Sequence, residues 1–175
     1  MSGFVLLAKP WWVNLLILIP VIPYFLSQNE KLRIGRKRLL VVALVGVAFG
    51  FVEAAVVVYL RAATGLWPNP QVKALVAVPE SLLRIECCRE AATMIMLSGI
   101  ALLAGKSAKE KGVVFLWTFA VWDIFYYVWL RLTIGWPTSL ISSDVLFLIP
   151  APWVAQVWFP LLVSGLTVLV IWFRS

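Results

Sequence analysis

Long apolar runs constrain the fold of this chain more than any other feature. Of its 175 residues, 63% are apolar and 13% are charged, against about 45–50% and about 25% in soluble domains. A helix that crosses a bilayer needs about 20 mostly apolar residues, and runs of this kind recur from one end of the chain to the other. The sequence therefore predicts an all-α integral membrane protein, with residues 1–175 forming a single transmembrane domain.

The apolar runs predict about five transmembrane helices, which we expect at residues 10–26, 39–60, 81–104, 113–134 and 154–173. The first run has no small-residue cleavage site after it, so we expect a retained helix and not a signal peptide. Residues 138–149 are also apolar but too few to cross a bilayer. We expect them to form a short interfacial or re-entrant helix against the protein, where backbone polar groups can find partners.

Basic residues predict the orientation of these helices. In the five-helix arrangement nine of them fall on one side of the membrane, namely Lys31, Arg33, Arg36, Lys37, Arg38, Lys106, Lys109, Lys111 and Arg174. Basic loops are retained on the cytoplasmic side. The N-terminus is therefore expected outside and the C-terminus in the cytoplasm, in a membrane of the bacterial cytoplasmic type. We attribute the net charge of +7 to this topology and expect no nucleic-acid partner.

One motif occurs twice. Glu53 is followed eight residues later by Arg61, and Asp123 by Arg131, with a constant offset of 70 residues between the copies. A glycine, a Trp-Pro pair, a Ser-Leu pair and a second acid follow in each case. Copies separated by two helices have the same orientation, which indicates a parallel repeat about an axis along the membrane normal.

The repeat divides the predicted domain into two halves. Residues 39–104 form the first half and residues 113–173 the second, while residues 1–38 add an N-terminal helix and a basic loop. The second acids of the two copies are Glu86 and Asp144. We expect the matching acids and arginines of both halves to converge around one centre in the outer half of the membrane.

Charged groups inside a membrane cost about 2.5–3.5 kcal/mol each on insertion scales, so they persist where they are paired or functional. The candidate catalytic residues are Glu53, Glu86, Glu90 and Asp123. The candidate substrate-binding residues are Arg61, Arg89, Arg131, Tyr126, Tyr127 and Asp144. Two interpretations remain open: an ion-paired network that locks helices together, or a polar site for a substrate or cation.

Three site chemistries fit these residue types. Carboxylates suit Mg²⁺, Ca²⁺ or Mn²⁺, arginines bind phosphate or carboxylate groups in two-point contacts, and acids in different environments can relay protons. The chain has no histidine, which excludes Ser-His-Asp catalysis, His-ligated haem and ordinary His-bearing zinc sites. The cofactor stays open, with a divalent cation on the carboxylates as a candidate.

The leading hypothesis is a small membrane protein that binds or processes a polar or anionic amphiphile, such as a lipid head group, with or without a cation. Whether it is an enzyme stays open; metal-assisted phosphoryl chemistry would be the first reaction to consider. A proton- or cation-coupled transporter is the second hypothesis, and an accessory subunit of a membrane complex is the third. The expected partners are membrane lipids, an amphiphilic ligand, and either a second copy or another membrane protein.

Overall fold

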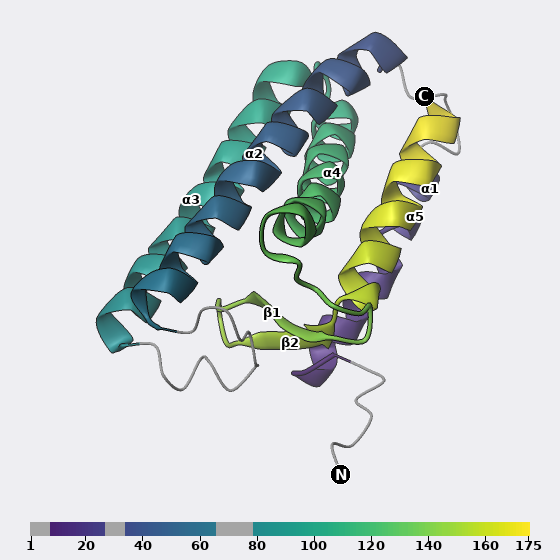
Figure 1. Ribbon diagram of the computed structural model, residues 1–175. Helices are drawn as coiled ribbons and strands as arrows, with labels where there is room; N and C mark the ends of the chain where they lie inside the picture. Colours follow the sequence, from purple (N-terminus) through teal and green to yellow (C-terminus); the bar gives the residue numbers. More distant parts are fainter. Residues whose placement is uncertain (1–7, 27–33, 66–78) are drawn as a thin grey trace.

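The computed structural model describes residues 8–26, 34–65 and 79–175, which are mostly helical (Figure 1). Three helices are long and apolar enough to cross a membrane: α2 (Arg36–Ala63), α3 (Glu80–Ala104) and α4 (Ala108–Ile134). The prediction of a helical membrane protein is confirmed at this level. Two further apolar segments are shorter, so the predicted number of five spans stays a prediction.

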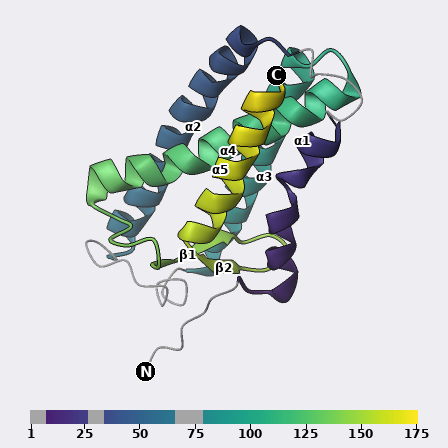
Figure 2. The same ribbon diagram turned by 90° about the vertical axis from the view of Figure 1, so that its right-hand side faces the viewer.

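The shorter segments correspond to the first and last predicted helices. The first is divided into a 3₁₀ helix, η1 (Trp11–Leu18), and a short α-helix, α1 (Val21–Leu26). Pro20 lies at the break, as expected for a residue that cannot donate a helical hydrogen bond. The last is α5 (Trp158–Arg174), which packs along α1. Helix α4 is inclined to the others and contacts α2, α3 and α5 (Figure 2).

Small residues let α2 and α4 approach closely. Gly46 and Gly50 are one turn apart on α2, in the G-x-x-x-G pattern that brings membrane helices together. A Cβ atom on Gly46 would lie 3.0 Å from Val121 Cγ1, and one on Gly50 would lie 3.0 Å from the backbone nitrogen of Tyr126. The α2–α4 contact therefore depends on the absence of side chains at these two positions.

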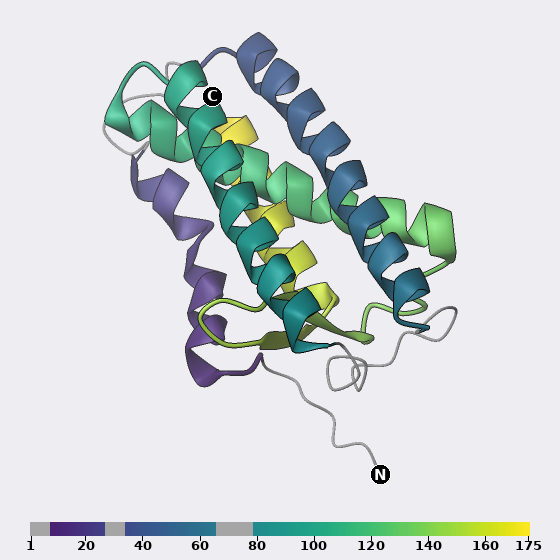
Figure 3. The same ribbon diagram turned by 90° about the vertical axis from the view of Figure 1, so that its left-hand side faces the viewer.

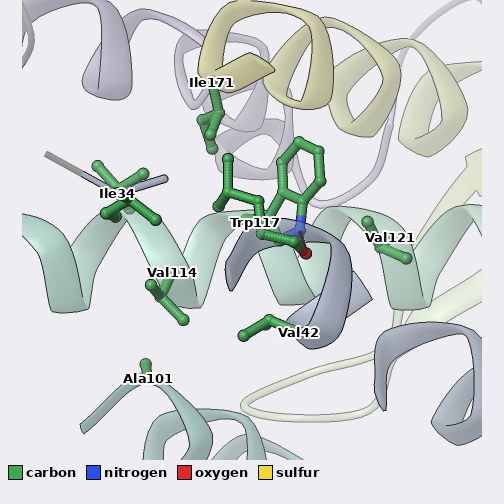
Figure 4. Packing of buried hydrophobic residues seen from close by; sticks show 9 residues of the cluster. Ile34, Val42, Ala101, Val114, Trp117, Val121 and Ile171 are labelled. Atoms are coloured by element: carbon green, nitrogen blue, oxygen red, sulfur yellow. Dashed lines mark hydrogen bonds between the residues drawn. The ribbon is translucent and has the colours of Figure 1, made fainter. Parts of the chain in front are cut away.

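A hydrophobic core fills the end of the bundle where α2 begins and α5 ends (Figure 4). Trp117 packs there against Ile171 and donates its indole N–H to the Leu39 carbonyl at 2.9 Å. Basic residues surround this end. The Nη1 atom of Arg38 lies 3.5 Å from Oε2 of Glu110, and the guanidinium of Arg174 lies over the ring of Tyr24. We call it the basic end; Lys31 and Arg33 of the predicted cluster lie outside the described residues.

The opposite end is closed by a β-hairpin where the sequence predicted a helix at 138–149. Strand β1 (Ser143–Phe147) pairs antiparallel with β2 (Trp153–Gln156), so the helix prediction for this segment is wrong. The predicted fifth helix is also shorter than expected, because residues 153–156 form β2. Pairing between the strands satisfies backbone groups that an apolar segment cannot expose to lipid. Short apolar runs do not distinguish helix from strand by periodicity.

The internal repeat stays a prediction. Its acid–arginine motifs both lie on long helices, α2 and α4, that run from the basic end toward the hairpin. The Ser-Leu segments that follow differ in conformation: residues 81–86 belong to helix α3, whereas residues 139–144 form a turn and the start of β1.

Candidate functional site

A cavity of about 700 Å³ lies near the hairpin end of the bundle. Its walls come from η1, α2, α3, α4, both hairpin strands, the hairpin turn and α5. Eight of the ten predicted site residues line it, namely Glu53, Glu86, Arg89, Glu90, Asp123, Tyr126, Tyr127 and Asp144. Residues separated by up to 91 positions in the sequence (Glu53 to Asp144) thus reach one space.

Arg89 forms the centre of an ion-paired group between α2 and α3. Its Nη1 atom pairs with Oε2 of Glu53, and its Nε donates to Oε2 of Glu86 at 2.8 Å. The hydroxyl of Thr93 donates to the other oxygen of Glu53 at 2.7 Å. One guanidinium therefore serves two carboxylates, both of which are buried.

Glu90 attaches α3 to the hairpin turn. The backbone N–H of Leu148 lies 2.9 Å from each of its carboxylate oxygens. A charge-assisted hydrogen bond of this kind fixes an otherwise unpaired backbone donor. The contact gives Glu90 a structural role, because it fixes the hairpin turn that lines the cavity.

Asp123 and Asp144 have only neutral hydrogen-bond donors among the described residues. Ser164 on α5 donates to Asp123 at 2.7 Å, and the hydroxyl of Tyr127 donates to Asp144 at 2.9 Å. Burial raises the pKa of Asp144 to about 6, although the hydrogen bond from Tyr127 and the nearby charge of Arg61 act in the opposite direction. Above that pH the carboxylate is ionised in an environment that compensates its charge poorly.

The remaining wall is aromatic and apolar. The ring of Phe119 lies 5.1 Å from that of Trp122 and stacks at 6.3 Å on Phe147, and all three line the cavity. Trp122 is 8% exposed, and its indole N–H has no hydrogen-bond partner among the residues described. A buried donor without a partner costs about 1–3 kcal/mol, so Trp122 is a position of unfavourable free energy in the wall of the cavity.

Two predicted arginines do not line the cavity. The guanidinium of Arg61 lies 4.7 Å from the ring centroid of Trp136, which is buried, and its Nη1 is buried without a hydrogen-bond partner in the described part of the chain. Arg131 is exposed and donates to the carbonyls of Gly135 and Pro137 at 2.5 and 2.9 Å. It thereby caps the C-terminal end of its own helix, where carbonyls lack partners.

The carboxylates do not form a metal centre within residues 8–26, 34–65 and 79–175. No three of the Asp, Glu or Cys side chains there are close enough together to hold one ion. Ca²⁺ takes six to eight oxygen ligands, whereas Mg²⁺ keeps several waters and is held by one or two carboxylates. The described residues therefore offer no carboxylate-rich site of the kind that Ca²⁺ takes.

Three residues of the site were not predicted from the sequence. Thr93 and Ser164 are hydroxyl residues within apolar helices, and each donates to a buried carboxylate. Polar residues inside membrane helices mark interhelical hydrogen bonds, so this signal was available. Trp122, next to Asp123, looked like one tryptophan among ten; only the folded chain distinguishes it from those at the surface.

No protein-family model, curated protein or solved structure matches this chain. Its function is therefore inferred from the cavity alone.

Proposed function

We propose that the protein binds an amphiphile in this cavity, with the polar head at the carboxylates and the apolar tail along the aromatic and aliphatic wall. The observation that carries the proposal is the composition of the cavity: charged and apolar groups share one space of about 700 Å³. Ligand sites of 300–1,000 Å³ with mostly apolar walls and a few convergent polar groups are typical of small-molecule binding.

The residues at the mouth of the cavity favour entry of a ligand from the lipid. Ala91 and Ile95 line the cavity from α3 and are also exposed, with Ile95 at 70%. Leu16 lines it from η1, and Ile19 lines it directly after that helix. Figure 3 shows α3 and the η1–α1 segment on two sides of the hairpin turn. An opening between apolar residues of helices is accessible to an amphiphile that already lies in the membrane.

The buried charges are explained only in part by a structural network. Arg89 compensates Glu53 and Glu86, and Glu90 holds the hairpin. Neither role requires an open cavity, and neither explains two further carboxylates with neutral partners. Burying charge for stability alone is unfavourable, since apolar replacements are often neutral or better.

Transport is the less favoured alternative. A transporter needs polar groups that continue to the other face, but the core at the basic end consists of packed apolar side chains. Thr118 is buried there, and its hydroxyl donates to the Val114 carbonyl of its own helix. Thr167 on α5 is buried as well, and its hydroxyl likewise donates to a carbonyl of its own helix, that of Val163.

We assign the cavity to the outer half of a bacterial-type cytoplasmic membrane. The support is the basic end, which carries Arg36, Arg38 and Arg174 on the opposite side of the bundle and would face the cytoplasm by the positive-inside bias. This orientation puts the N-terminus outside and the C-terminus inside. The parallel repeat remains part of the proposal, because Glu53 and Asp123 line the same cavity.

Filling the mouth should expel the amphiphile. We expect Ala91→Trp to reduce the ratio of amphiphile-bound to free protein by about tenfold, equivalent to about 1.4 kcal/mol of binding free energy. Native mass spectrometry of protein released from mild detergent measures this ratio. Ala92→Trp is the matched control, since Ala92 is also exposed on α3 but does not line the cavity. Equal occupancy in both variants, or an unoccupied wild type, would contradict the proposal.

A further inference from the structure

We infer that the head group bound in the cavity is a cation of the alkylammonium type. This inference rests on the amphiphile binding proposed above and adds the charge of the ligand. It departs from the anionic ligand that the arginines of the sequence suggested, because the folded chain keeps two of those arginines out of the cavity.

The charged side chains that line the cavity favour a cationic head group. Five carboxylates line the cavity, whereas Arg89 is the one cation among its described lining residues. Arg89 is already shared between Glu53 and Glu86. A phosphate or carboxylate head would find no uncommitted guanidinium there and would meet like charges, which is unfavourable at binding sites.

Asp123 and Asp144 can each accept more hydrogen bonds than they receive. An ionised carboxylate offers about four acceptor positions, and each of these two receives one side-chain hydrogen bond from a neutral hydroxyl. A charge-assisted hydrogen bond from an ammonium group is about twice as strong as a neutral one. These two side chains are therefore the sites where a bound cation gains most.

The aromatic wall of the cavity also favours a cationic head group. Trp122, Phe119 and Phe147 line the same cavity as Asp123 and Asp144. Ring faces attract ammonium groups, most strongly those of tryptophan, and the attraction grows where water is excluded. Acids together with aromatic rings recognise an organic cation better than an anion.

A charge series in the wild-type protein tests this inference. The probes are hexadecylammonium, hexadecyl phosphate and hexadecanol, radiolabelled and presented at trace amounts in maltoside micelles to protein stripped of co-purified lipid. We expect the ammonium probe to bind at least tenfold more tightly than the phosphate, with the neutral alcohol between them. Tighter or equal binding of the phosphate or the alcohol would overturn the inference and leave the proposed function intact.

Variants of the lining residues test which side chains select the ammonium head group. Asp123→Asn combined with Asp144→Asn should weaken binding of the ammonium probe at least tenfold and leave hexadecanol binding unchanged. Glu80→Gln is the control, because Glu80 is an exposed acid that pairs with Arg84 outside the cavity. If the double variant does not fold, Trp122→Leu provides the test through a several-fold loss of ammonium binding alone. Unchanged ammonium binding in the folded variants would contradict the inference; failure of all three probes in the wild type would contradict the proposed function as well.

Discussion

Arg89→Gln is expected to destabilise the protein by about 3–5 kcal/mol at neutral pH, the usual cost of leaving a buried charge without its partner. Glu53 and Glu86 would both lose their cation, and their side chains are 6% and 11% exposed. The measurement is the free energy of unfolding in mixed detergent and SDS micelles, followed by tryptophan fluorescence.

Two companion variants make the test specific. Arg84→Gln on the same helix breaks an ion pair whose side chains are 77% and 79% exposed, and exposed pairs contribute about 0–1 kcal/mol. Adding Glu53→Gln to Arg89→Gln should restore part of the loss, because one uncompensated charge is removed. Equal effects of Arg84→Gln and Arg89→Gln, or additive losses in the double variant, would show that the buried group is not coupled.

Gly50→Leu is expected to separate α2 from α4 and to cost about 3 kcal/mol or more, at or beyond the usual range for overpacking. Even a Cβ atom at Gly50 would lie 3.0–3.1 Å from backbone atoms of Tyr126, Phe125 and Trp122, which cannot move aside as a flexible side chain could. The same unfolding measurement applies, and Gly50→Ala should give a smaller loss.

Gly99 on α3 provides the matched control for this helix contact. A Cβ atom there would meet nothing within 4 Å, and replacing a helical glycine commonly gains up to about 1 kcal/mol. Gly99→Leu should therefore leave stability unchanged or raise it. A Gly50→Leu protein as stable as Gly99→Leu would mean that α2 and α4 do not pack as described.

The sequence predicted the membrane class and most of the charged residues that line the cavity, because both depend on residue types that are rare in their surroundings. Charged residues inside apolar runs require partners, so Glu53, Glu86, Glu90 and Asp123 could be identified before any contact was known. Their convergence on one cavity agrees with that argument. The helices α2, α3 and α4 agree with the predicted spans within a few residues at most ends.

The hairpin and the arginines could not be predicted in the same way. Residues 143–147 adopt a strand because a second segment, residues 153–156, is available to pair with them, and this depends on the tertiary fold. Arg61 and Arg131 match in the two motifs, yet one lies over Trp136 and the other caps a helix. Their positions depend on what surrounds each helix end, which spacing within one chain does not encode.

The most direct measurement is a crystal structure at high resolution, grown in a lipidic mesophase from protein extracted without delipidation. We expect elongated density in the cavity, with its tail between α3 and η1 and its polar end within hydrogen-bond distance of Asp123 or Asp144. A cavity that holds only ordered water, or one closed by collapse of α3 onto η1, would contradict amphiphile binding.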